Sequence, residues 1–250
     1  MKKTISLLCL ILIFTLFTSI IASAKENSWY CIRTPDHKRP PLPSEFNYIK
    51  DYNGYYIGED EKVVYLTFDA GYENGNVERT LDILKAQDVP GAFFVLSNLI
   101  NQNPDLIIRM ADEGHLICNH TSKHPDMTKM ATIGEFKSEI DALEKLCIDI
   151  TGKEVAKYFR PPEGKFNEQT LQFANELGYK TIFWSFAYAD WDNNNQMSEA
   201  KAKEKILSNI HNGAIILLHP TSETNTRILE DVITELKAQG YRFGSLDELE

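Results

Sequence analysis

The feature that most constrains the fold is a regular alternation of apolar runs of strand length with amphipathic segments of helix length. This alternation is typical of a parallel sheet whose connecting helices pack outside it. We predict seven strands in one wrap, and therefore an α/β fold built as a closed or nearly closed barrel. An open doubly wound sheet is the alternative, since periodicity alone does not separate the two. The predicted strands span residues 62–68, 92–96, 116–119, 157–160, 180–186, 214–219 and 241–243.

The predicted helices carry apolar residues three and four positions apart and most of them end at a glycine. In the longest of them, Phe136, Ile140 and Leu143 share one face. Another begins at Pro104, a residue suited to the first turn of a helix. The predicted helices span residues 76–87, 104–113, 132–150, 167–177, 198–212 and 224–239.

The first 24 residues have the pattern of an export signal. Lys2 and Lys3 form a positive start, residues 5–21 an apolar core, and Ala-Ser-Ala at 22–24 a small-residue cleavage site. The apolar core approaches the length that spans a bilayer, so a retained membrane anchor is the alternative to cleavage. Either interpretation predicts that the folded part of the chain lies outside the cytoplasm.

The formal charge of the chain argues against a nucleic-acid partner. It is −10 for all 250 residues, and removal of the two signal lysines would take it to −12. Phosphate backbones are bound by basic surfaces, which this composition does not supply. Between the signal and the first predicted strand, residues 25–61 contain four prolines, and we predict an ordered arm that wraps the domain formed by residues 62–250. A linker is the alternative.

Polar side chains lie at or just after the ends of five predicted strands. In a parallel barrel the carboxyl ends of the strands converge on one face, where such enzymes place their active sites. Asp69 taken alone has an alternative explanation as a turn-capping residue. The five residues together predict one site: Asp69, His120, Arg160, Asp190 and His219.

Three of these residues, together with the neighbouring His124, have the chemistry of hydrolysis. His120 and His124 are spaced so that two imidazoles can bind one divalent metal and leave positions open for water and substrate. A pair of surface or structural histidines is the alternative. Asp69 would take a proton from water and His219 would protonate a leaving nitrogen, which together cleave an amide or an ester.

The remaining site residues would support this pair. Arg160 can keep Asp69 ionised through a charge-assisted contact. The alternative is that the same contact is a structural salt bridge with no role in catalysis. Asp190 would orient either His219 or Arg160. Trp191 would give a flat wall for a sugar ring, with core packing as the alternative.

Together, these residues resemble the motifs of a known family. Five motifs match, in order, those of the polysaccharide deacetylases with a NodB homology domain: residues 67–71, 120–124, 160–164, 190–191 and 217–219. The resemblance covers about residues 62–250. It implies a distorted (β/α)7 barrel, with Asp69 as base, His219 as acid and Arg160 as the partner of the base. It also implies that His120 and His124 bind a divalent metal, with zinc expected.

A longer resemblance narrows the expected substrate. Residues 67–75, the Arg-Pro-Pro at 160–162 and the proline-rich arm resemble the peptidoglycan N-acetylmuramic acid deacetylases of spore formers, which make the muramic δ-lactam of spore cortex. The implied partner is the glycan strand of peptidoglycan, with Trp191, Pro162 and Tyr72 expected to bind it. Two alternatives stay open: a deacetylase of N-acetylglucosamine in peptidoglycan or chitin, and a glycan-binding domain that has lost catalysis.

Two positions depart from the family pattern. The first motif usually carries a second aspartate, the third metal ligand, where this chain has Ala70. The muramic subgroup commonly has asparagine there, whereas an alanine offers no ligand atom, so we expect a weakened metal site. The fourth motif usually has an aspartate where this chain has Ala187. Glu73 and Asn74 are the nearby side chains that could replace the missing ligand.

Overall fold

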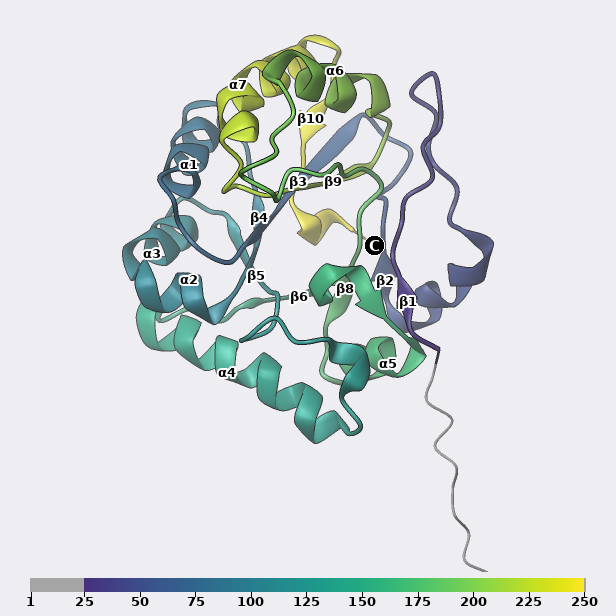
Figure 1. Cartoon of the computed structure of the whole chain (residues 1–250), viewed down its shortest axis with the longest axis vertical. Coiled ribbons are helices and arrows are strands. Elements are labelled where there is room, and N and C mark those ends of the chain that lie inside the picture. Colours follow the sequence, from purple (N-terminus) through teal and green to yellow (C-terminus); the bar gives the residue numbers. More distant parts are fainter. Residues whose placement is uncertain (1–24, 250) are drawn as a thin grey trace, which may run out of the picture.

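The computed structural model describes residues 25–249. The predicted export signal, residues 1–24 with the apolar core 5–21, lies outside the described residues. A curled parallel sheet occupies the centre and helices surround it (Figure 1). All seven predicted strands are present: β3 (Val63–Ala70), β4 (Ala92–Val95), β5 (Leu116–Asn119), β6 (Ala156–Phe159), β8 (Lys180–Ile182), β9 (Ala214–Leu218) and β10 (Arg242–Phe243).

The strands form a distorted barrel, as predicted. β3 lies between β4 and β9, and the parallel order continues from β4 through β5 and β6 to β8. A parallel bridge between Phe186 and Ile216 connects the segment after β8 to β9 and so joins the two ends of the sheet. β3 is buried along nearly its whole length, which explains its continuous apolar sequence.

The predicted strand 180–186 is interrupted in the structure, because β8 ends at Ile182. Beyond it, a side chain replaces part of the backbone ladder. The hydroxyl of Ser185 accepts a hydrogen bond from the backbone N–H of Ile215 at 3.1 Å. The backbone N–H groups of Ser185 and Phe186 both donate to the carbonyl of Ile215. This shared acceptor leaves the barrel irregular where it closes.

The six predicted helices are present within one or two residues at most ends, and one further helix was not predicted. This is α2, a six-residue helix that is too short to show an amphipathic period. The longest helix begins with a capping box formed by Thr132 and Glu135 and ends at Gly152. The helices are α1 (Asn76–Ala86), α2 (Ser97–Gln102), α3 (Pro104–Asp112), α4 (Ile133–Thr151), α5 (Glu168–Glu176), α6 (Glu199–Asn209) and α7 (Glu223–Ala238).

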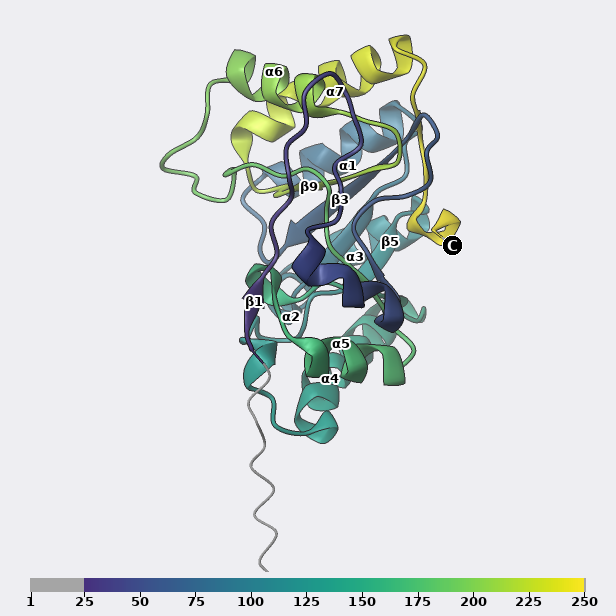
Figure 2. The same cartoon turned by 90° about the vertical axis from the view of Figure 1, so that its right-hand side faces the viewer.

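Residues 25–61 are packed against the barrel. β1 (Asn27–Ser28) pairs with β7 (Lys165–Phe166), and β2 (Gly54–Tyr55) adds to the sheet beside β8. Trp29 stacks on Phe183 with ring centroids 4.3 Å apart. Figure 2 shows this arm, in purple, running along the face of the molecule that is turned toward the viewer. Among residues 25–249 there is no helix with the length and apolar character needed to cross a membrane.

Candidate active site

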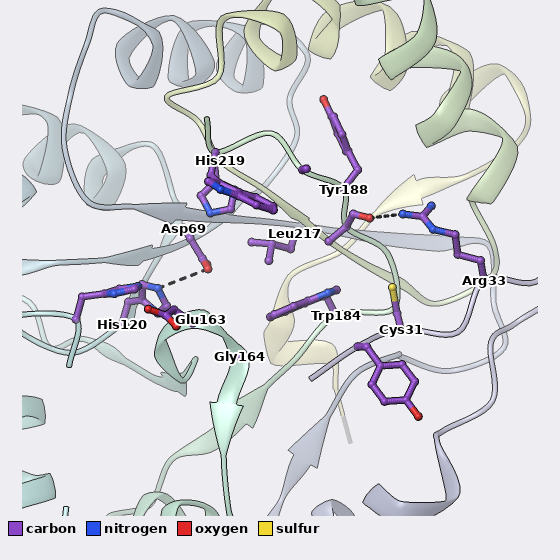
Figure 3. A pocket seen from close by; sticks show the side chains of 15 residues that line it. Cys31, Arg33, Asp69, His120, Glu163, Gly164, Trp184, Tyr188, Leu217 and His219 are labelled. Carbon is purple, nitrogen blue, oxygen red and sulfur yellow. Dashed lines mark hydrogen bonds and ion pairs between the residues drawn. The ribbon is translucent and has the colours of Figure 1, made fainter. Parts of the chain in front are cut away.

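A cavity of about 800 Å³ opens at the carboxyl ends of the strands (Figure 3). Asp69 reaches it from the end of β3, and His219 from the residue after β9. His120 and His124 line it from the loop after β5, and Trp191 from the long loop that precedes α6. The barrel therefore brings together residues that lie at separate strand ends in the sequence.

Asp69 is held by a fully buried arginine. Nη1 of Arg160 donates to Oδ1 of Asp69 at 2.7 Å. Two further donors of the guanidinium are fixed by Thr67 Oγ1 at 2.8 Å and by the carbonyl of Ile182 at 3.0 Å. Its carbon lies 4.1 Å above the ring of Phe94. Because every side of the guanidinium is engaged, the position of the carboxylate is fixed as well.

The charges around Asp69 keep it ionised. Burial disfavours the carboxylate form and would raise its pKa, but the positive charge of Arg160 opposes this, with smaller contributions from His120 and His219. The net result is a pKa of Asp69 below its ordinary value. Asp69 is therefore a carboxylate at neutral pH, the form that can accept a proton.

His219 is held by a buried carboxylate. Its Nδ1 donates to Oδ1 of Asp190 at 2.7 Å, and its backbone N–H donates to Oδ2 at 2.8 Å. Asn225, from the first turn of α7, donates to the same Oδ2 at 2.5 Å. Asp190 is 1% exposed. The sequence left two possible partners for it, His219 and Arg160, and in the structure its partner is His219.

The contact with Asp190 favours the protonated form of His219. Burial lowers the pKa of the imidazole, but the hydrogen bond and charge of Asp190 outweigh burial and raise the pKa above its ordinary value. Within the described residues, Nε2 of His219 makes no hydrogen bond. A protonated imidazole with a free N–H in a cavity is suited to give a proton to a leaving group.

His120 and His124 lie side by side, with ring centroids 5.0 Å apart. Nδ1 of His120 donates to the carbonyl of Arg160 at 2.8 Å, and Nε2 lies 3.6 Å from Oδ2 of Asp69. Burial lowers the pKa of His120 to about 4, so its Nε2 carries a lone pair at neutral pH. This is the form of imidazole that binds metals.

The loop that carries the two histidines is strained. Thr121 and His124 both have positive φ, 73° and 60°. This conformation is unfavourable for a β-branched residue such as Thr121. The hydroxyl of Thr121 accepts a hydrogen bond from the backbone N–H of His124 at 2.9 Å, which stabilises the turn. Both imidazoles line the cavity from this loop.

The donors present fit a divalent ion held by two imidazoles rather than by three protein ligands. Within residues 25–249 no group of three or more His, Cys, Asp or Glu side chains is arranged to hold a metal. Ala70 is fully buried and has no donor atom. Glu73 does not take its place, because its carboxylate accepts from the backbone of Gly75 and Val77 at the start of α1. Asn74 donates instead to the carbonyl of Thr221.

The three residues predicted to bind substrate lie in different settings. Trp191 lines the cavity, is 62% exposed, and lies edge-on to His219 with centroids 6.3 Å apart. Of the described residues, neither Tyr72 nor Pro162 is among those that line the cavity. Tyr72 is exposed and accepts a hydrogen bond from Asn193 at 2.9 Å, whereas Pro162 is buried in a turn.

Several residues at the site were not identified from the sequence. Tyr30, Cys31 and Arg33 line the cavity although they belong to the arm. Asn225, which fixes Asp190, belongs to α7. None of them stands at a strand end, so the pattern that identified the other residues could not detect them. The aromatic and apolar run that includes Trp29 and Tyr30 was the available signal for a packed arm.

Comparison with known proteins agrees with the geometry. The family model described as polysaccharide deacetylase matches residues 57–182. The peptidoglycan-N-acetylmuramic acid deacetylase PdaA of Bacillus subtilis is 43% identical over 224 residues, 89% of this chain and 85% of PdaA. The chain belongs to the polysaccharide deacetylase family, as its motifs predicted.

Solved structures give the same assignment. The structure of Bacillus subtilis PdaA, a family 4 carbohydrate esterase, is similar with a TM-score of 0.87 and 42% identity, covering 90% of this chain and 97% of that one. A family 4 carbohydrate esterase from Bacillus anthracis is similar with a TM-score of 0.72 and 37% identity, covering 88% and 98%. These similarities confirm the predicted fold.

Proposed function

We propose that this protein removes acetyl groups from N-acetylmuramic acid residues of peptidoglycan, outside the cytoplasm. The observation that carries the proposal is the pairing of Asp69 with Arg160 and of His219 with Asp190 at one cavity. The similarity to PdaA supports the muramic substrate. We also propose that the product is an intermediate of the muramic δ-lactam of spore cortex, and that residues 1–24 export the chain or anchor it.

The carboxylate of Asp69 acts as the base. It is ionised at neutral pH and its position is fixed by Arg160, so it can accept a proton from a water molecule in the cavity. Loss of that proton makes the water oxygen nucleophilic enough to attack the acetamide carbonyl. Arg160 fixes the position of the Asp69 carboxylate and favours its charged form before the proton is transferred from water.

The imidazolium of His219 acts as the acid. Asp190 accepts from Nδ1, so Nε2 is the nitrogen left to donate a proton to the departing amine as the C–N bond breaks. Acetate and a free amino sugar result, and one water is consumed. Trp191 at the rim offers an exposed ring on which a sugar can stack.

His120 and His124 are the residues that would hold a divalent metal, and we propose zinc. When bound, such an ion polarises a carbonyl and makes a water molecule more acidic. We propose that the ion is bound weakly, because Ala70 removes a ligand that the family usually provides at this position.

Chelation tests this proposal. We expect dialysis against EDTA to lower acetate release and to remove the ion from the protein, and added zinc to restore both. Metal content measured by mass spectrometry gives a readout that does not depend on activity. The variant Ala70→Asp should retain more metal through the same dialysis, whereas His120→Ala should retain less. Activity that survives complete loss of metal would overturn the metal proposal and leave the roles of Asp69 and His219 standing.

Digested wall glycan tests the proposed substrate. We expect the purified protein to release acetate from glycan strands. Mass spectrometry of the digested strands should then show a loss of about 42 Da per event on muramic residues, because hydrogen replaces an acetyl group. Stem-free and stem-bearing strands should be compared. Loss of acetyl from glucosamine residues alone would overturn the muramic assignment in favour of the N-acetylglucosamine alternative.

A glycan-binding domain without catalysis is the second candidate, because Ala70 leaves the metal site with two protein ligands. It predicts binding of glycan strands and no acetate release at any zinc concentration. The ionised Asp69 and the raised pKa of His219, caused by its hydrogen bond to Asp190, favour the enzyme, since binding alone needs neither a base nor an acid.

A further inference from the structure

One arginine that lines the cavity, Arg33, has no role in the proposed mechanism. Arg33, from the arm, lines the cavity together with the acid–base residues. In Figure 3, Arg33 lies across the cavity from Asp69, His120 and His219, near Tyr188 and Trp184. Its Nη2 donates to the carbonyl of Ala187 at 2.7 Å.

The contacts of Arg33 orient its guanidinium without neutralising it. The guanidinium carbon lies 5.2 Å from the centroid of the Phe186 ring, which packs against it. Among residues 25–249, no aspartate or glutamate forms an ion pair with Arg33, and its other N–H donors make no hydrogen bond. An arginine has five such donors in a planar fork, which matches the geometry of a carboxylate.

The acidic groups of the same cavity are already paired. Asp69 is neutralised by Arg160 at 2.7 Å, and Glu163 by Lys165 at 2.7 Å. Ala187, which contacts Arg33, and Ala189, which also lines the cavity, carry no charge. An anion that enters the cavity therefore finds one cation without a counter-ion.

We propose that Arg33 binds the carboxylate of a muramic residue held in the cavity and so determines specificity for muramic over glucosamine strands. This inference rests on the proposed function, which requires a muramic substrate. The two sugars differ by a lactyl ether, whose carboxylate is the only charge that distinguishes them. A charge-assisted, two-point contact to that carboxylate favours one substrate without touching the acetamide that reacts.

The test uses two synthetic glycan oligomers that differ in one group: a free lactyl carboxylate, or the same lactyl group as a neutral carboxamide. We expect the wild-type protein to prefer the carboxylate by about 10- to 100-fold in kcat/KM, the range of a hydrogen bond to a charged group. Arg33→Gln should bring the ratio of the two substrates close to one, mainly by raising KM for the carboxylate. Arg33→Lys should retain part of the preference, because it keeps the charge but loses the fork.

Arg39→Gln is the matched control. Arg39 belongs to the same arm and is anchored to the carbonyls of Asn212 and Gly58, and it is not among the described residues that line the cavity. This variant should keep the wild-type preference. If Arg33→Gln lowers kcat/KM equally for both oligomers, Arg33 only anchors the arm and the inference is wrong. A wild-type ratio of one overturns it as well.

The proposed function fails in a different way. A wild-type protein that deacetylates glucosamine oligomers and neither muramic oligomer would overturn the muramic substrate and, with it, the role of Arg33. Retained activity on both muramic oligomers with an unchanged ratio in Arg33→Gln would overturn the role of Arg33 alone.

Discussion

Asp69→Asn is expected to lower kcat for acetate release by about 10²- to 10⁴-fold, the contribution typical of a positioned general base. The amide cannot accept the proton of the attacking water, although it occupies the same volume. The variant also removes the negative partner of Arg160, a fully buried cation. Breaking a buried pair on one side costs about 3–5 kcal/mol, and the amide oxygen offsets part of that by still accepting a hydrogen bond.

Kinetics and unfolding must therefore be measured together. Acetate release at saturating substrate reports the chemical step, and thermal unfolding reports how much of the loss is stability. Asp82→Asn is the matched control, because Asp82 is an exposed aspartate that also pairs with an arginine, Arg109 at 2.6 Å. It should leave kcat unchanged. A folded Asp69→Asn protein with wild-type kcat would exclude Asp69 as the base.

His219→Ala is expected to lower kcat by a similar factor of about 10²- to 10⁴-fold, because the amine would leave without a proton. The pH profile identifies this role more sharply than the loss of rate. The acid must be protonated, so activity should fall as pH rises through the pKa of His219. Asp190 raises that pKa above its ordinary value, which extends activity toward alkaline pH.

Asp190→Asn should move this alkaline limb in the opposite direction. Without the carboxylate, the burial that lowers the pKa of His219 is no longer outweighed, so activity should be lost at lower pH than in the wild type. Asn225→Ala is a milder companion, since it removes one hydrogen bond from Asp190 and keeps the charge. An alkaline limb that stays at the same pH in Asp190→Asn would contradict the assignment of His219 as the acid.

The alternation of strands and helices was predictable because it depends on the spacing of apolar residues within short stretches of sequence. The apolar run of β3 predicts a buried strand, and the apolar residues on one side of α4 predict an amphipathic helix. α2 was missed for the same reason, since six residues contain too little of a helical period. The break after Ile182 was missed because it depends on a side-chain contact between Ser185 and a strand thirty residues later.

The pairing of Asp69 with Arg160 could also be anticipated, although 91 residues separate them. Both stand at the ends of strands, and a parallel barrel brings such ends to one face. The partner of Asp190 could not be decided in this way, because the loop that carries it can approach either His219 or Arg160. Hydrogen bonds from His219 and from Asn225 of α7 settle it.

By itself, the sequence determined the α/β class, the family and the residue types at the five strand ends, because these depend on local pattern and on motif order. Tertiary structure alone decided which side chains complete the site. Arg33 reaches the cavity through a contact with Ala187, 154 residues away, and Glu73 turns to cap α1 rather than toward the histidines. No local period encodes such contacts, since they depend on how the arm and the loops pack once the barrel has formed.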